Sequence, residues 1–193
     1  MNYLAHSYLS SHNDGLLTGN FIADAVKGRP EGRFPNDIVQ GIIMHRAIDE
    51  YTDKHPAIKE FVSVFRPLYG RYAPVLTDVL FDYLLAGNWA NFSDVELPFF
   101  ADDVYGRLGA NRAHFPERMQ QFYTHMVQHN FLVNYGTNQG ISQTLSRLQM
   151  RSQSTVDFTQ SIALLENEKG RLSSLFEEFF IDMQQELIYR KYK

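Results

Sequence analysis

Three apolar segments of the chain each carry short polar side chains spaced four residues apart. These side chains are Asn20 and Asp24 in GNFIADAV, His45, Asp49 and Asp53 in MHRAIDEYTD, and Asp78 and Asp82 in VLTDVLFDYLL. On a helix, residues four apart lie one turn from each other on the same face. A carboxylate in apolar surroundings needs a partner or a metal ion, because an isolated charge is costly to bury. The pattern therefore favours one shared polar site over three unrelated solvated stripes.

The chemistry available to such a site is that of a divalent cation. The chain has no cysteine, so metal ligands must be His, Asp, Glu or Asn, which suits Mg²⁺, Mn²⁺, Fe²⁺ or histidine-bound Zn²⁺. Ligands on three helices would leave coordination positions open for water, which a cation turns into a nucleophile at neutral pH. The reaction indicated is metal-assisted hydrolysis, most naturally of a phosphate ester.

Asp53 and three other residues near these pairs have simpler explanations. His6 lies in the apolar segment NYLAHSYL, where a lone histidine is more often a hydrogen-bonded core residue. Asp53 comes near the end of its helix, and we expect it to face solvent. His55 precedes Pro56 and is expected to cap that helix end through its charge. Arg46 is either an ordinary surface arginine or a residue that reaches a phosphate.

Helices must position these residues, because helical periodicity dominates the chain and no clean alternating strand pattern is present. We therefore predict an all-α fold. Pro35 and Pro56 mark the two ends of the helix that carries His45. The predicted helices cover residues 2–10, 15–27, 36–53, 56–70, 72–88, 98–110, 115–134, 138–150 and 157–190, the last with allowance for a break near Gly170.

Length and composition bound the architecture. The chain has 193 residues, of which 44% are hydrophobic, so we predict one helical domain over 1–193 with the site in about 1–90. A formal net charge of −4 argues against a general nucleic-acid-binding protein, which needs a basic surface. The sequence shows no signal-peptide pattern and no membrane span, so we expect a cytoplasmic, soluble protein. The sequence does not indicate an oligomeric state.

Four blocks of the sequence closely resemble the bacterial acyl carrier protein phosphodiesterase family. They are MNYLAHSYLS, GNFIADAVKG, GIIMHRAIDEYTDKHP and RYAPVLTDVLFDYLLAGNW. The resemblance is specific over residues 1–89 and looser toward the C-terminus. It implies hydrolysis of the phosphodiester that joins 4'-phosphopantetheine to a serine of holo acyl carrier protein. It also implies an HD-domain-like helical fold and a divalent metal, with Mn²⁺ preferred and Mg²⁺ or Fe²⁺ as alternatives.

The resemblance also implies roles for individual residues. Typical HD proteins have adjacent His and Asp, whereas here His45 is followed by Arg46, so Asp49 would supply the aspartate. Asp24 stands where a histidine would often begin the ligand set. The implied metal ligands are Asp24, His45, Asp49 and Asp78, with Asp82 as a further ligand or a residue that orients one. The implied phosphate-side residues are His6 and Asn20, near the phosphate or the attacking water, and Arg46, which would pair with phosphate oxygens.

The implied partner raises an electrostatic problem. Acyl carrier proteins are strongly acidic, and this chain is itself acidic, so net charge would not steer the two together. Recognition would need a local basic surface, and the best cluster in the sequence is Lys27, Arg29 and Arg33. The next best is formed by Arg66 and Arg71. The simpler reading of either cluster is a solvated surface.

Two rival functions are compatible with the same residues. One is an HD-type hydrolase that acts on a nucleotide or another small phosphoester. The other is a helical protein that binds metal or a partner without turnover. A di-iron oxidase is a weaker reading, because the Glu-x-x-His ligand pairs of that class are absent from the sequence.

Overall fold

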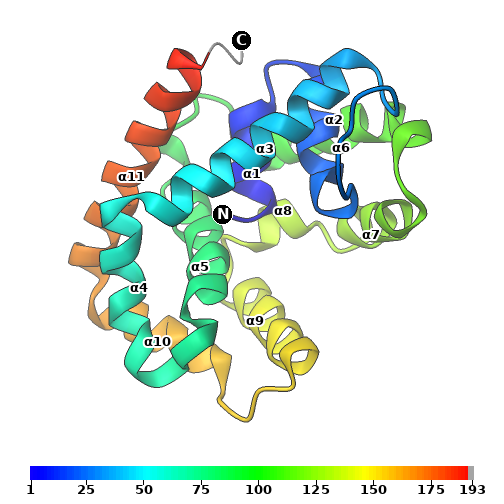
Figure 1. Ribbon diagram of the computed structural model, residues 1–193. Helices are drawn as coiled ribbons and strands as arrows, with labels where there is room; N and C mark the ends of the chain where they lie inside the picture. The colour runs from blue at the N-terminus through cyan, green and yellow to red at the C-terminus, as the bar shows by residue number, and fades with distance from the viewer. Residues whose placement is uncertain (191–193) are drawn as a thin grey trace.

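The computed structural model describes residues 1–190, which form helices and no strand (Figure 1). The prediction of an all-α fold is therefore confirmed. The α-helices are α1 (Tyr3–Ser10), α2 (Asp14–Ile22), α3 (Asn36–Lys54), α4 (Pro56–Tyr69), α5 (Ala73–Gly87), α6 (Leu97–Ala110), α7 (Glu117–Gln128), α8 (Phe131–Asn134), α9 (Asn138–Ser152), α10 (Ser161–Asn167) and α11 (Lys169–Tyr189). The predicted domain boundary at residue 193 lies outside the described residues.

Three predicted helices are shorter or broken. The segment 15–27 leaves α-helical geometry after Ile22 and continues as the short 3₁₀ helix η1 (Ala23–Ala25). The segment 115–134 breaks at Asn130, which adopts the left-handed conformation with φ of 44°. The segment 157–190 breaks at Glu168 rather than at Gly170. Backbone conformation at Asn130 and at Glu168 decides the second and third breaks, and hydrophobic periodicity does not register it.

Close packing of α2 against α3 fixes the positions of their polar side chains relative to each other along the helix axes. A Cβ atom on Gly19 would lie 2.0 Å from the carbonyl oxygen of Ile38, and a Cβ on Gly41 would lie 2.3 Å from that of Leu16. Only glycine permits this approach of two backbones. Gly19 is next to Asn20, and Gly41 is one turn before His45. The contact therefore brings Asn20 toward the face of α3 that carries His45.

A side chain of α5 anchors the first turn of the N-terminal helix α1. The fully buried Asp82 of α5 accepts hydrogen bonds from the backbone N–H groups of Leu4 (2.8 Å) and Ala5 (3.1 Å). A carboxylate at this position satisfies N–H groups that a helix leaves free in its first turn and complements the positive end of its dipole. The contact sets the position of His6, which follows one residue later.

One hydrophobic core runs through the molecule and includes buried side chains from α1 to α11. His55 ends α3, and its Nδ1 accepts the backbone N–H of Ala57 at the start of α4, so it caps the following helix rather than α3 through its charge. Its Nε2 lies 3.2 Å from Asp182 Oδ2 on α11. Among residues 1–190, no helix is both long and apolar enough to cross a membrane.

Candidate functional site

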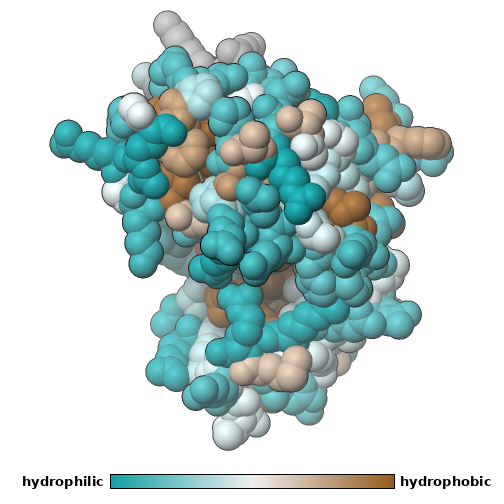
Figure 2. Space-filling model, turned by 90° about the vertical axis from the view of Figure 1, so that its right-hand side faces the viewer, coloured by the Kyte–Doolittle hydropathy of each residue, from teal (hydrophilic) through white to brown (hydrophobic). Residues whose placement is uncertain are grey.

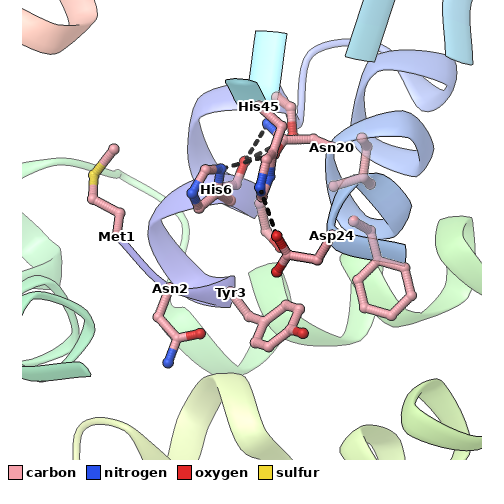
Figure 3. A pocket seen from close by; sticks show the side chains of 11 residues that line it. Met1, Asn2, Tyr3, His6, Asn20, Asp24 and His45 are labelled. Atoms are coloured by element: carbon pink, nitrogen blue, oxygen red, sulfur yellow. Dashed lines mark hydrogen bonds and ion pairs between the residues drawn. The ribbon is translucent and has the colours of Figure 1, made fainter. Parts of the chain in front are cut away.

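Two histidines from different helices share one amide oxygen. The Nδ1 atoms of His6 on α1 and His45 on α3 lie 2.8 Å and 2.9 Å from Oδ1 of Asn20 on α2 (Figure 3). A carbonyl oxygen only accepts hydrogen bonds, so each Nδ1 carries a proton and donates it. In a neutral imidazole the other nitrogen, Nε2, then has the free lone pair. Asn20 therefore holds both rings in the tautomer that binds a cation through Nε2.

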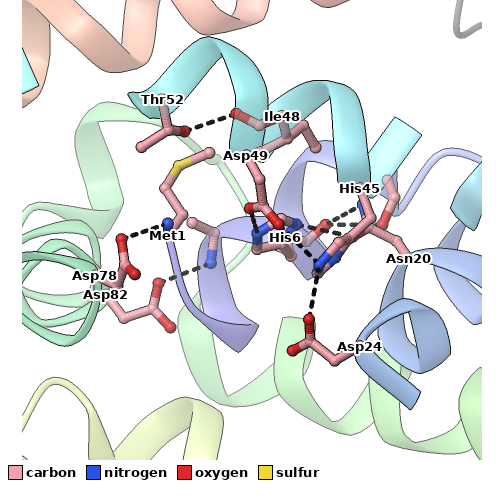
Figure 4. A network of polar contacts seen from close by, with 12 residues as sticks. Met1, His6, Asn20, Asp24, His45, Ile48, Asp49, Thr52, Asp78 and Asp82 are labelled. Carbon is pink, nitrogen blue, oxygen red and sulfur yellow. Dashed lines mark hydrogen bonds and ion pairs between the residues drawn. The ribbon is translucent and has the colours of Figure 1, made fainter. Parts of the chain in front are cut away.

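Asp49 faces both of these Nε2 atoms. Its Oδ1 lies 3.3 Å from Nε2 of His6, and its Oδ2 lies 3.1 Å from Nε2 of His45 (Figure 4). The two imidazole rings are stacked with their centroids 4.3 Å apart. His45 and Asp49 are one turn apart on α3, as their spacing in the sequence predicts, whereas His6 reaches the group from α1.

The charges of this group are strongly coupled. Burial opposes the protonated form of His45, but hydrogen bonds and charge from Asp24 and Asp49 outweigh it and raise the pKa of His45 to about 9. Burial and the positive charge of His45 lower the pKa of His6 to about 4. The pKa of Asp49 lies far below its ordinary value because both histidines stabilise the carboxylate against burial. At neutral pH the group therefore contains a neutral His6, a cationic His45 and an anionic Asp49.

The residues present fit a divalent cation. The Nε2 atom of His6 is buried and lacks a hydrogen-bond partner, although an oxygen of Asp49 lies 3.3 Å away. Since the ring is neutral and its proton is on Nδ1, two electron-pair donors face each other there, which is an unfavourable contact unless a cation lies between them. One donor atom each from His6, His45 and Asp49 lies within 4.8 Å of the others. Two imidazoles and a carboxylate are the donor set of Mn²⁺, Fe²⁺ or Zn²⁺.

Asp24 lies at the solvent side of the same group. It belongs to η1, is exposed, and places its Oδ1 3.3 Å from Nε2 of His45. The hydrogen bond with His45 lowers the pKa of Asp24 although partial burial opposes this shift. Asp24 therefore borders the group, but it lies outside the three residues whose donor atoms come closest together.

The structure brings Asp78 and Asp82 less directly into the site. Asp78 lines an open cleft together with Asp24, His45, Asp49, Thr52 and Asp53. Its Oδ1 lies 2.8 Å from the amino group of Met1, and burial raises its pKa. Asp82 points at the backbone of α1 instead, and burial raises its pKa to about 7 despite the hydrogen bonds it accepts there. Asp53, expected to face solvent, is exposed at the rim of this cleft.

Arg46, which was predicted to pair with phosphate oxygens, and the predicted docking residues all lie around the loop that follows η1. Arg46 is exposed, and its Nη2 donates to the carbonyl oxygens of Val26 and Gly28, both at 2.9 Å. Arg33 donates from Nη1 to the carbonyl oxygen of Lys27 at 2.9 Å. These guanidinium groups hold the loop, and the structure does not bring Arg46 into the His6 and His45 group. Lys27, Arg29 and Arg33 are exposed at the surface of this loop.

The site residue whose neighbours the sequence did not predict is His6. It was expected near the phosphate or the attacking water, whereas its Nε2 lies with the donor atoms of His45 and Asp49. The signal was present, because His6 is a polar residue in an apolar segment just as Asp78 and Asp82 are. His6 has no acid or second histidine one turn away, however, so its pairing depends on how α1 packs.

The comparisons with known proteins agree with each other. The family model described as acyl carrier protein phosphodiesterase matches residues 1–183. The chain is 32% identical over 186 residues to the acyl carrier protein phosphodiesterase of Pectobacterium atrosepticum, with 96% of each chain covered. The corresponding protein of Yersinia pestis is 31% identical over 192 residues, 99% of this chain and 100% of the relative. No solved structure matches the chain, so the HD-domain-like arrangement stays a prediction.

These matches extend well beyond the four sequence blocks that lie within residues 1–89. An Enterobacter relative with the same description is 33% identical over 181 residues, 93% of this chain and 94% of its own length. The C-terminal helices are therefore part of the resemblance as well as the helices that carry the histidines. The resemblance seen in the sequence is confirmed, and the chain belongs to the acyl carrier protein phosphodiesterase family.

Proposed function

We propose that the chain is a phosphodiesterase that removes 4'-phosphopantetheine from holo acyl carrier protein. Water adds to phosphorus, the bond from phosphorus to the serine oxygen breaks, and that oxygen leaves as the serine hydroxyl of the apo carrier. Family membership and the name of the relatives support the reaction. The observation in the structure that supports it best is the arrangement of His6 and His45. Asn20 orients both rings through their Nδ1 atoms, and the carboxylate of Asp49 lies beside both Nε2 atoms.

We assign a divalent cation to His6, His45 and Asp49, with Mn²⁺ as the first choice and Mg²⁺ or Fe²⁺ as alternatives. Imidazole ligands favour Mn²⁺ and Fe²⁺ over Mg²⁺, which prefers oxygen donors. When bound, the cation would activate water and stabilise negative charge on the phosphoryl oxygens. Asp24 is the next ligand in reach, because its carboxylate already lies beside Nε2 of His45. Asp78 would act from farther along the cleft wall.

His45 and Asp49, which would hold the cation, also line the open cleft together with Asp24. No lysine or arginine is among the residues that line this cleft in the described part of the chain. Neutralisation of a bound phosphodiester would therefore fall to the cation, while Asn20 keeps the two histidines in their binding tautomer. Asp82 would act indirectly by holding the start of α1 and thus His6.

The test is a mass measurement on holo acyl carrier protein incubated with the chain and Mn²⁺, with and without EDTA. We expect the carrier to lose the mass of 4'-phosphopantetheine only when free metal is present. Cleavage of small phosphodiesters or nucleotides with no change in the holo carrier would favour the small-phosphoester hydrolase. Metal binding without turnover of either substrate would favour the non-enzymatic reading.

A basic docking loop at Lys27, Arg29 and Arg33 remains part of this proposal, and a cytoplasmic location and a single domain stay predictions. Reversal of the three charges in K27E/R29E/R33E should weaken binding of the carrier. It should leave metal binding unchanged, because the loop lies outside the group of His6, His45 and Asp49, which we call the cation group. Kinetics equal to those of the unsubstituted chain would contradict the docking role of this loop.

A further inference from the structure

One stretch of this acidic chain carries net positive charge because it is nearly free of carboxylates. Residues 104–156 contain five arginines and a single carboxylate, Glu117, which gives +4, whereas the whole chain carries −4. The stretch contains α7, α8 and α9, and α7 and α9 reach the right-hand side of Figure 1, which is the side that Figure 2 faces. A surface opposite in sign to the rest of a protein can steer a partner that shares the protein's own net charge.

Two of the five arginines are engaged within the fold. Arg107 forms ion pairs with Asp14 and Asp103, and Arg112 donates a 2.8 Å hydrogen bond to Thr124 Oγ1. The other three are Arg118, Arg147 and Arg151. Within residues 1–190 none of these three forms an ion pair, so we call them the arginine face. Arg118 and Arg151 are exposed, so their charges are available to a partner.

A row of aromatic contacts ties this face to the N-terminal helix. The ring of Tyr3 on α1 lies 4.6 Å from that of Phe122 on α7, measured between centroids. Phe122 lies 6.0 Å from Phe131 on α8. The guanidinium of Arg147 on α9 covers the ring of Phe131 at 5.4 Å. The row therefore connects four helices in space and brings both α7 and α9 against Phe131.

The other two arginines stand one helical turn from members of this row. Arg118 precedes Phe122 by four residues on α7, and Arg151 follows Arg147 by four on α9. Both are exposed. Both charges act on the hydroxyl of Tyr3 and lower its pKa, although burial and Asp24 together raise that pKa to about 12. Arg118 and Arg151 thus flank the aromatic row from two separate helices.

Tyr3 is also a wall of the site. It lines the same pocket as His6, Asp24 and His45, and Figure 3 shows its ring beside the carboxylate of Asp24. Figure 2 views the side of the molecule that lies to the right in Figure 1, and this face is hollowed near its middle. Hydrophobic residues lie in the hollow, and hydrophilic residues surround it. Because Tyr3 also contacts Phe122 of the aromatic row, the row links the arginine face to the wall of this pocket. An acidic macromolecule bound there would have its attached group next to the site.

We propose that the arginine face is a docking surface, in addition to the loop of Lys27, Arg29 and Arg33, for an acidic protein surface whose phosphodiester enters the pocket past Tyr3. This inference rests on the proposed function, which supplies acyl carrier protein as that partner. Unpaired, exposed guanidinium groups bind carboxylates through charge-assisted hydrogen bonds. Exposed charges of this kind determine association rate and salt dependence more than the chemical step.

The test compares R118E/R151E with a control that makes the same change in charge elsewhere. Arg147 is left in place because it covers Phe131. The control K59E/R171E reverses two exposed charges on α4 and α11, and α5 lies between α4 and α9 in the packing. For each protein, binding of holo acyl carrier protein is measured in EDTA, so that it does not depend on turnover. Steady-state cleavage is then measured with Mn²⁺ at several salt concentrations, with bis(4-nitrophenyl) phosphate as a small substrate.

We expect R118E/R151E to lower kcat/KM for the holo carrier on the order of 10-fold or more at low salt, through KM, and to flatten its salt dependence. Hydrolysis of the small diester should be unchanged, because the cation group is intact. Equal carrier binding by R118E/R151E and the unsubstituted chain would overturn the docking surface alone, as would an equal loss in K59E/R171E. An unsubstituted chain that binds the carrier through these arginines but never cleaves it would overturn the proposed function alone.

Discussion

Binding of a divalent cation to His6, His45 and Asp49 should release about one proton at pH 7.5. The pKa of His45 is raised to about 9 in the metal-free protein, so the ring is about 97% protonated at that pH. The ring must lose the Nε2 proton to ligate a metal. The other two residues contribute no proton, because the pKa of His6 is lowered to about 4 and that of Asp49 is also lowered. Apparent affinity should thus fall about tenfold for each pH unit below 9.

The assay is calorimetric titration with Mn²⁺ in buffers of similar pKa and different ionisation enthalpy. The slope of the observed enthalpy against buffer enthalpy gives the number of protons released. Asp24→Asn is the matched variant, because it removes one of the two carboxylates that raise the pKa of His45. It should shift half-complete release to lower pH. Affinity that does not change between pH 6 and 8.5, or no proton release, would refute this description of the group.

The raised pKa of His45 also determines how the stability of the metal-free protein changes with pH. Because the pKa of His45 is higher in the folded chain than its ordinary value of 6.5, its contribution to the stability of the metal-free protein is complete below pH 6.5. That contribution is about 3 kcal/mol. It is lost as the pH rises through 9, so metal-free protein should unfold at progressively lower urea concentration between these two values.

Three further substitutions test how the fold positions the group. Asn20→Leu removes the oxygen that both Nδ1 atoms share and should weaken Mn²⁺ binding by about 10- to 100-fold in the same titration, whereas unchanged affinity would exclude this orienting role. Asp82→Asn should lower the free energy of unfolding by about 1–3 kcal/mol in urea. This loss should be smaller at pH 8 than at pH 5, because a raised carboxyl pKa means stability declines as the group ionises; a larger loss at pH 8 would contradict it. Gly19→Ala places a Cβ against the backbone of α3 and should destabilise the chain by about 1–3 kcal/mol and weaken metal binding. Gly170→Ala, which meets no atom within 4 Å, should leave metal binding unchanged and raise stability by about 0.5–1 kcal/mol; equal effects of the two alanines would show that the contact is unimportant.

Sequence pattern predicted the helices well and the pairing of their side chains only in part. His45 and Asp49 face the same point because they are one turn apart on a single helix, which is local geometry. Asp78 and Asp82 have the same spacing, yet one lies beside the amino group of Met1 and the other binds the backbone of α1. Spacing fixes a shared face, but the neighbour that this face meets depends on the packing of distant helices.

The same limit explains His6 and Arg46. His6 has no acid or second histidine one turn away that would mark it as part of a set, and its meeting with Asn20 depends on the anchoring of α1 by Asp82 and of α2 by Gly19. Arg46 directly follows a site residue in sequence, but neighbours on a helix point about 100° apart. Its guanidinium instead binds two carbonyl oxygens of the loop after η1.

The most direct test of the central claim is an anomalous-difference map from a crystal of this chain grown with Mn²⁺. We predict one strong peak within bonding distance of Nε2 of His6, Nε2 of His45 and the carboxylate of Asp49. Asp24 is the first candidate to complete the ligand set from the cleft side. A peak held by Asp53 and Asp78 without either histidine, or no peak at saturating Mn²⁺, would contradict the account.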